Sequence, residues 1–164
     1  MNFLLTGILG KGHYFVIMAL VVAIDRLTKV WALTTCLTYR ALMPGLSCEL
    51  VFNKGISWGM LQADSRLSQI ALTCALISII VFLLYYTYKR FERGLTIVGE
   101  VLVIAGSLSN IADRLLYGAV VDFIHIGYHG LEFPTFFNIA DAAIVLGVLM
   151  MLKSTKGFCA SADV

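Results

Sequence analysis

Four long apolar stretches limit what this chain can fold into more than any other feature of its sequence. They cover approximately residues 13–33, 67–88, 94–116 and 135–152, and the second stretch contains no charged residue. A helix needs about 20 mostly apolar residues to cross the roughly 30 Å of hydrocarbon in a bilayer. Only 13% of the chain is charged, against about 25% in an ordinary soluble domain. We therefore predict an all-α membrane protein with four transmembrane helices, formed as one domain over residues 1–164.

The first stretch has a second interpretation, a cleaved signal peptide. Its uncharged core, Tyr14–Ile24, has a suitable length, and Lys11 precedes it. However, Asp25 and Arg26 follow the core at once, and no convincing small-residue cleavage site lies beyond Val21–Ala23. We therefore favour a helix that is retained in the mature protein.

Basic residues near the ends of the stretches predict their orientation, because cytoplasmic loops of membrane proteins carry an excess of Lys and Arg. In a four-helix topology the clustered basic residues fall on one side, namely Lys11, Lys89, Arg90, Arg93, Lys153 and Lys156. That side is expected to be the cytoplasm, with both termini there. The loops of about 34–66 and 117–134 then face outward.

The two outer loops have the pattern of strands and turns. Residues Cys48–Phe52 alternate in polarity, Val120–Ile126 is rich in β-branched and aromatic residues, and Leu131–Phe133 follows a turn bounded by glycines. We therefore expect a small extracytoplasmic β element. A disulfide between Cys36 and Cys48 is chemically permitted in an outer loop, although their spacing does not require one.

Polar residues from three of the stretches reach a similar depth in the bilayer. At about 1.5 Å per residue, Asp141 lies roughly 18 Å from the inner boundary, Asp25 roughly 21 Å and Asn110 roughly 25 Å. Ionisable groups inside a membrane are costly and usually mark a functional or packing role. Their convergence in the outer half of the membrane indicates a site there. Glu100 lies nearer the inner side, and the sequence suggests no role for it.

Two neighbouring carboxylates are the leading candidates for chemistry at such a site. One, ionised, activates a water as general base, while the other, protonated, donates to the carbonyl oxygen and then to the leaving amine. The spacing leaves open whether Asp113 or Asp122 partners Asp141. The sequence contains no zinc signature, phosphate loop or Ser/His/Asp set, so we expect no metal and no cofactor. The net charge of +2 is too small to suggest nucleic-acid binding.

Each polar motif also has a structural interpretation. Asp25 and Lys29 are spaced i, i+4 and form a natural ion pair. Asp113 with Arg114 suits a local ion pair, and Asn53 with Gly55 suits a turn. Asn110 and Asn138 are suited to hydrogen bonds between helices.

Five segments in order along the chain resemble the lipoprotein signal peptidase (signal peptidase II) family. They are DRLTK (25–29), FNKGISW (52–58), GSLSNIADR (106–114), VVDFI (120–124) and FNIAD (137–141). The resemblance implies an aspartyl endopeptidase of the bacterial cytoplasmic (inner) membrane, with its active site towards the extracytoplasmic side. Such an enzyme cleaves diacylglyceryl-modified prolipoproteins immediately before the lipidated cysteine of the lipobox. The resemblance also implies an outer β-cradle, a mobile outer helix and inhibition by compounds of the globomycin type.

The resemblance implies roles for particular residues of this chain. The family's catalytic dyad corresponds to Asp122 and Asp141. Residues that line the dyad or the substrate site, or that support it, correspond to Asn53, Gly106, Asn110, Arg114, Asn138, Asp25 and Lys29. No cofactor is needed, the partners are the lipid bilayer and the prolipoprotein substrates, and we expect a monomer.

The chain departs from the family pattern at a few positions. Ala105 and Ser109 stand where the family usually has glycine, and Ile56 is bulkier than the usual small residue. We expect activity to survive the first two changes, and Ile56 to alter the fit of substrate or inhibitor. Two other classes remain open: a proton-coupled carrier that uses Asp141 and Glu100 as relay groups, and a non-catalytic membrane scaffold.

Overall fold

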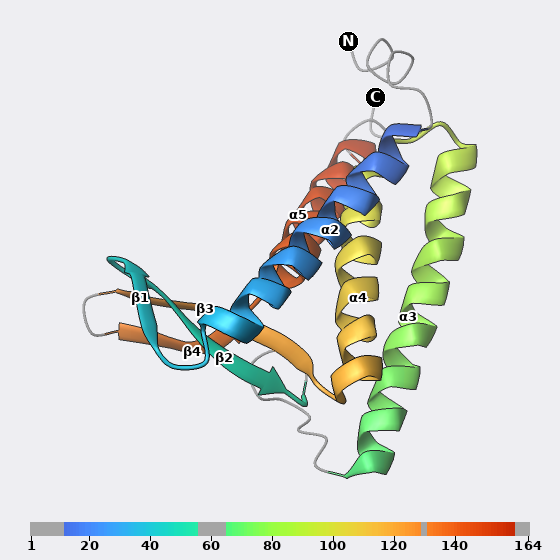
Figure 1. The fold of residues 1–164 in the computed structure, drawn as a ribbon. Coiled ribbons are helices and arrows are strands. Elements are labelled where there is room, and N and C mark those ends of the chain that lie inside the picture. The colour runs from blue at the N-terminus through green and yellow to red at the C-terminus, as the bar shows by residue number, and fades with distance from the viewer. Residues whose placement is uncertain (1–11, 56–64, 129–130, 160–164) are drawn as a thin grey trace.

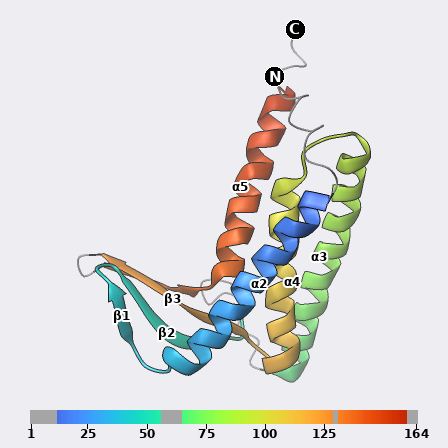
Figure 2. The same cartoon turned by 45° about the horizontal axis from the view of Figure 1, so that its top comes forward.

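The computed structural model describes residues 12–55, 65–128 and 131–159, and four long helices and one sheet make up this part of the chain. In chain order the elements are α2 (Gly12–Thr35), β1 (Arg40–Met43), β2 (Leu46–Asn53), α3 (Arg66–Glu92), α4 (Val98–Tyr117), β3 (Val120–Tyr128), β4 (Leu131–Phe137) and α5 (Ile139–Cys159). The sheet projects from one end of the bundle (Figures 1 and 2). The start of α2, the α3–α4 connection and the end of α5 lie together at the other end (Figure 1).

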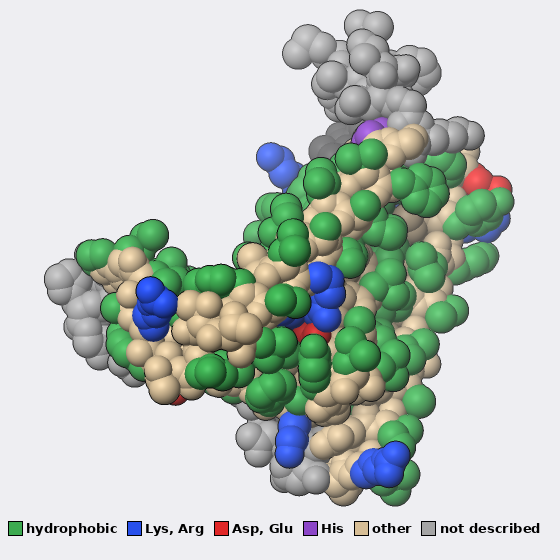
Figure 3. Space-filling model, in the orientation of Figure 1, with side chains coloured by type: hydrophobic (Ala, Val, Ile, Leu, Met, Phe, Trp, Pro, Cys, Tyr) green, Lys and Arg blue, Asp and Glu red, His purple; other side chains and the backbone are tan. Residues whose placement is uncertain are grey.

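Helix α4 is the centre of the bundle, and α3 is its most exposed member. Half of the residues in α4 are buried, including Val101 and Ile104, whereas α3 buries only Ile80 and Thr87. Apolar side chains cover the visible face of the helices (Figure 3). By length and composition alone, α3 is the one helix of the described residues that is long and apolar enough to cross a membrane, which by itself is a weak indication of a span.

Small residues let α4 and α5 approach closely. A Cβ atom on Gly106 would collide with the carbonyl oxygen of Ala140, and one on Gly147 would collide with the backbone of α4 at Gly99. Close backbone contact at small residues is typical of helix pairs in membranes. The contact at Gly106 brings the start of α5 against the middle of α4, one turn before Asn110 on α4.

The sheet is antiparallel with strand order β1-β2-β3-β4. Its central pair, β2 and β3, sets Val51 opposite Asp122 and Cys48 opposite Ile124, with an irregularity in register between these pairs. The described sheet is larger than predicted: β1 was not expected, and β4 runs to Phe137 rather than Phe133.

The fourth helix begins at Ile139, so the prediction of helix from residue 135 was wrong. Residues 135–137 instead continue β4, the last strand of the sheet. Pro134 is compatible with this position because β4 is an edge strand of the sheet. Sheet pairing with β3 and a cap at Asn138 therefore outweigh the apolar pattern in setting this boundary.

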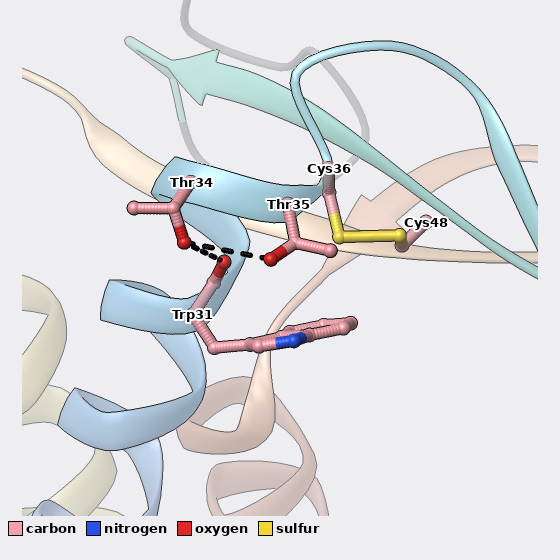
Figure 4. The surroundings of a disulfide bond; sticks show 5 residues. All are labelled: Trp31, Thr34, Thr35, Cys36 and Cys48. Atoms are coloured by element: carbon pink, nitrogen blue, oxygen red, sulfur yellow. Dashed lines mark hydrogen bonds between the residues drawn. A yellow bond between two sulfur atoms is a disulfide. The ribbon is translucent and has the colours of Figure 1, made fainter.

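A disulfide joins the end of α2 to β2, which answers the question that the spacing of the cysteines left open. Cys36 and Cys48 are bonded with their Cα atoms 5.6 Å apart, close to the end of α2 where Thr34 donates to the carbonyl of Trp31 (Figure 4). Both sulfurs belong to a small buried cluster with Ala32 and Phe123. The sheet is thereby attached to the helical bundle by a covalent bond as well as by packing.

Candidate active site

Asn138 begins α5 and sets the position of Asp141. The Oδ1 of Asn138 accepts a hydrogen bond from the backbone N–H of Asp141 at 2.9 Å. In return, Asp141 Oδ2 accepts from the backbone N–H of Asn138 at 3.2 Å. This reciprocal pair is a capping box, which satisfies N–H groups that a helix start would otherwise leave unpaired. Asp141 is therefore held at the first turn of α5 by the same bonds that start the helix.

The side-chain amide of Asn138 also reaches the second carboxylate. Its Nδ2 donates to Asp122 Oδ1 at 2.7 Å and to the carbonyl of Val121 at 3.2 Å. It lies 3.2 Å from Asn110 Oδ1 as well, and Asn110 Nδ2 in turn donates to Asp141 Oδ1 at 2.7 Å. Two amides thus connect Asp122 on β3 with Asp141 on α5.

Asn53 approaches Asp122 from the neighbouring strand. Its Nδ2 donates to Asp122 Oδ2 at 3.0 Å, while its Oδ1 accepts from the N–H of Gly55 at 2.9 Å. Asn53 therefore forms the turn expected from its pairing with Gly55 and also contacts the carboxylate. Both oxygens of Asp122 accept a hydrogen bond from an amide, and its side chain is 1% exposed.

Burial, and after it the charge of Asp141, raise the pKa of Asp122 to about 7. The hydrogen bonds from Asn53 and Asn138 oppose this rise because they stabilise the ionised form. The Asp122 carboxyl is consequently able to hold a proton or release it near neutral pH. This behaviour suits a group that exchanges a proton during a reaction.

The two carboxylates open onto one cavity of about 270 Å³ between the helices and the sheet. Its polar side chains include Asn53, Asn110 and Arg114, and Arg114 donates to the carbonyl of Gly55. Its apolar side is formed by residues of α3, α4 and α5, among them Leu76, Ile79, Ile80, Ile111, Ile144 and Val145. The cavity therefore combines a small polar floor with an apolar wall.

A layer of buried charges lies behind this cavity, on the side of α2. Lys29 Nζ contacts Asp25 Oδ2 at 2.9 Å, as the i, i+4 spacing predicted. Lys29 also contacts Asp113 Oδ2 at 2.7 Å and donates to Asn110 Oδ1 at 2.9 Å. The interpretation of Asp113 and Arg114 as a local ion pair was wrong, because Asp113 pairs with Arg26 and Lys29 of α2.

The predicted site residues separate into three groups in the structure. Around the cavity lie Asp122, Asp141, Asn53, Asn110 and Arg114, and Asn138, which does not line it, donates to Asp122. Behind it lie Asp25 and Lys29, whereas Gly106 is a contact point between α4 and α5. Ile56 and Trp58 of the second motif, and Lys11, lie outside the described residues.

The sequence predicted no partner for Glu100 or Ser109. Glu100 pairs with Arg90 at 2.6 Å near the opposite end of the bundle, far along α4 from the cavity. Ser109 donates to Asp25 Oδ2 at 2.6 Å from a buried position. Neither pairing follows from helical spacing, because the partners lie on different helices. Within the residues the structure describes, no three His, Cys, Asp or Glu side chains are grouped to hold a metal ion.

Known proteins share both the sequence and the fold of this chain. Residues 17–156 match the family described as signal peptidase (SPase) II. The chain is 34% identical to a lipoprotein signal peptidase of Wigglesworthia glossinidia brevipalpis, over 82% of this chain and 88% of that protein. It is 30% identical to a lipoprotein signal peptidase of Polynucleobacter necessarius subsp. necessarius, over 92% and 94% of the two chains. A solved bacterial membrane enzyme superposes with a TM-score of 0.72 at 30% identity, covering 89% of this chain and 94% of that one.

Proposed function

The chain belongs to the signal peptidase II family, and from this premise we propose that Asp122 and Asp141 are its catalytic dyad. As a member of this family it is a membrane aspartic protease that cleaves signal peptides from prolipoproteins. The observation that carries the proposal is the pair of carboxylates on one cavity, joined through the amides of Asn138 and Asn110. No other pair of acidic side chains lines this cavity among the described residues.

The dyad works by sharing one proton between two carboxyl groups. The ionised carboxylate takes a proton from a water molecule as the water oxygen attacks the scissile carbonyl carbon. The protonated partner gives its proton to the carbonyl oxygen, which forms a tetrahedral diol. Collapse of the diol breaks the C–N bond as the first carboxyl gives the proton that it accepted to the leaving nitrogen. One diol hydroxyl at the same time returns a proton to the second carboxylate as the C=O bond re-forms, which restores the dyad with one shared proton. The pKa of about 7 for Asp122 places this group near the point at which either direction of transfer is accessible.

The wall of the cavity suits an apolar substrate segment. Ile79 and Ile80 of α3 and Ile144 and Val145 of α5 line the same cavity as the two carboxylates. We propose that the signal peptide lies against this wall, with the bond before the diacylglyceryl-modified cysteine at the dyad. The lipid on that cysteine would hold the scissile bond at the level of the outer leaflet. The rise per residue along the helix predicts a similar depth for Asp141.

We propose that α2, α3, α4 and α5 all span the bilayer, with both termini in the cytoplasm. Basic residues at the end of the bundle opposite the sheet support this orientation, and they include Lys89, Arg90 and Arg93. The Cys36–Cys48 disulfide supports an extracytoplasmic sheet, since disulfides persist in oxidising compartments. The proposed enzyme is one domain over residues 1–164 that acts as a monomer in the bacterial inner membrane.

The deciding experiment is cleavage of a diacylglyceryl-modified lipobox peptide by the purified protein in detergent. Asp122→Asn and Asp141→Asn are each expected to abolish turnover, because the dyad then lacks one of its two proton carriers. Glu49→Gln is the matched control, because it removes a carboxylate from β2 that does not line the cavity. Full activity in either aspartate variant would refute the dyad, and inhibition of the wild type by globomycin would support the assignment of the activity to this family's site.

The same protein also tests the two other classes. A proton-coupled carrier would show ion-dependent uptake in vesicles and no peptide cleavage, and a scaffold would show neither. The pairing of Glu100 with Arg90 removes one of the two relay groups that a carrier would use, since that carboxylate is occupied at the far end of the bundle. The geometry therefore favours the peptidase.

A further inference from the structure

Asp113 contacts the backbone that carries the first dyad aspartate. It lies on α4 with its side chain fully buried, and its Oδ2 accepts from the backbone N–H of Val121 at 3.2 Å. Val121 is the residue immediately before Asp122. The position of Asp122 on β3 is therefore tied to α4 through a carboxylate that does not itself line the cavity.

Asp25 makes the equivalent contact with the second dyad aspartate. It lies on α2, also fully buried, and its Oδ1 accepts from the backbone N–H of Ala140 at 2.9 Å. Ala140 immediately precedes Asp141, in the first turn of α5. A carboxylate at this end of a helix is favoured both by the unpaired N–H groups and by the helix dipole.

Lys29 connects the two buried carboxylates. Its Nζ lies 2.9 Å from Asp25 Oδ2 and 2.7 Å from Asp113 Oδ2. Arg26 also bridges this pair, at 2.7 Å from Asp113 Oδ1 and 3.3 Å from Asp25 Oδ2. Two anions and two cations thus balance one another, which is the condition under which buried charges persist. The two backbone contacts belong to one connected cluster.

Ser109 adds a neutral donor to this cluster. Its hydroxyl donates to Asp25 Oδ2 at 2.6 Å, and its side chain is 2% exposed. This oxygen also contacts Lys29, so the hydroxyl and the ammonium hold one oxygen of Asp25 while the other faces Ala140. The serine thereby orients the Asp25 carboxylate toward the start of α5.

We infer that Asp25 and Asp113, joined by Lys29 and oriented in part by Ser109, are positioning residues that set the separation of Asp122 and Asp141. The inference depends on the proposed function, because it assigns the cluster to that dyad. None of the four side chains lines the cavity among the described residues, and Asp113 and Asp25 act through the backbone of Val121 and Ala140, respectively. A displacement of reacting groups by about 1 Å can cost on the order of 100-fold in rate.

The test uses Ser109→Ala and Asp113→Asn in the full chain, with Ser78→Ala as the control. Ser78 is an exposed serine of α3 that hydrogen-bonds only within its own helix among the contacts described. Loss of the Ser109 hydrogen bond is expected to lower kcat for the lipobox peptide roughly fivefold, with KM unchanged. Asp113→Asn is expected to lower kcat by about tenfold or more, because it removes a charge-assisted contact and two ion pairs.

Hydrogen exchange of two backbone amides separates positioning from a general loss of folding. Ser109→Ala should speed exchange at Ala140 and leave Val121 unchanged, whereas Asp113→Asn should speed exchange at Val121 first. Unchanged exchange at both amides, or wild-type kcat in both variants of a protein that cleaves, overturns the inference. A wild type that does not cleave overturns the proposed function instead, and the exchange rates still decide whether the carboxylates hold these amides.

Discussion

Asn138 offers the sharpest perturbation of the site, because one side chain both starts α5 and stabilises the ionised form of Asp122. Asn138→Ala removes the cap on Asp141, which is worth about 1 kcal/mol of stability. It also removes the 2.7 Å hydrogen bond from Nδ2 to Asp122 Oδ1. Asn138→Ser keeps a good capping residue but lacks the amide donor, so the two effects can be measured separately.

The size of the electrostatic effect follows from this contact. A hydrogen bond to a charged group contributes about 1.5–3 kcal/mol, and one pKa unit corresponds to about 1.4 kcal/mol. Because the bond favours the carboxylate, its loss should raise the pKa of Asp122 from about 7 by roughly one to two units. The limb of the activity profile that Asp122 controls then moves to higher pH by the same amount.

The assay is the pH dependence of kcat/KM for the lipobox peptide, with thermal unfolding in detergent measured on the same samples. Both variants should show the shifted limb, and Asn138→Ala alone should lose the stability of the cap. If Asn138→Ser keeps the wild-type pH profile, the amide does not stabilise the charge of Asp122 and the reasoning fails. If the serine variant unfolds as early as the alanine variant, the capping argument fails.

Three further outcomes are expected. Gly106→Ala should lower the unfolding temperature markedly, because its methyl group would collide with the backbone of α5, whereas Gly12→Ala, which meets nothing nearby, should not; equal melting of the two variants would contradict the close contact. Reduction of the Cys36–Cys48 disulfide, seen as a gel shift, should lower the free energy of unfolding by about 3 kcal/mol for a loop of this length, and an unchanged melting curve would show that packing alone holds the sheet. The free energy of unfolding should fall as pH rises from about 4 to about 7, because folded Asp122, with its raised pKa, keeps a proton that the unfolded chain has released. Asp122→Asn should flatten this pH dependence, and a variant that keeps the wild-type dependence would assign it to another group.

Local patterns predicted much of the fold because they depend on nearby residues. The apolar stretches located the helices, although α4 begins at Val98 and not at 94. Alternation and β-branched content indicated β2 and β3. The strand β1 was missed, because four exposed residues carry little pattern of their own and depend on pairing with β2.

The candidate site was found from the sequence only to a limited extent. Depth along the helices brought Asp25, Asn110 and Asp141 to one level, and the family motifs singled out Asp122. The partners of Asp113 and Ser109 could not be predicted, since they lie on α2, a helix more than 80 residues away in the chain. Helical spacing identifies neighbouring residues on one helix, but it does not show which face of another helix packs against them.

The sequence by itself determined that this chain is apolar enough for a membrane, where its helices lie and which motifs it shares with signal peptidase II. Those properties follow from composition and from short-range periodicity. Only the tertiary structure decided that Asn138 joins Asp122 to Asp141, that Asp25 and Asp113 hold the backbone beside them, and that Glu100 belongs to Arg90. These contacts depend on the crossing of α2, α4 and α5 and on the register of β2 with β3, which arise from packing between segments far apart in the chain.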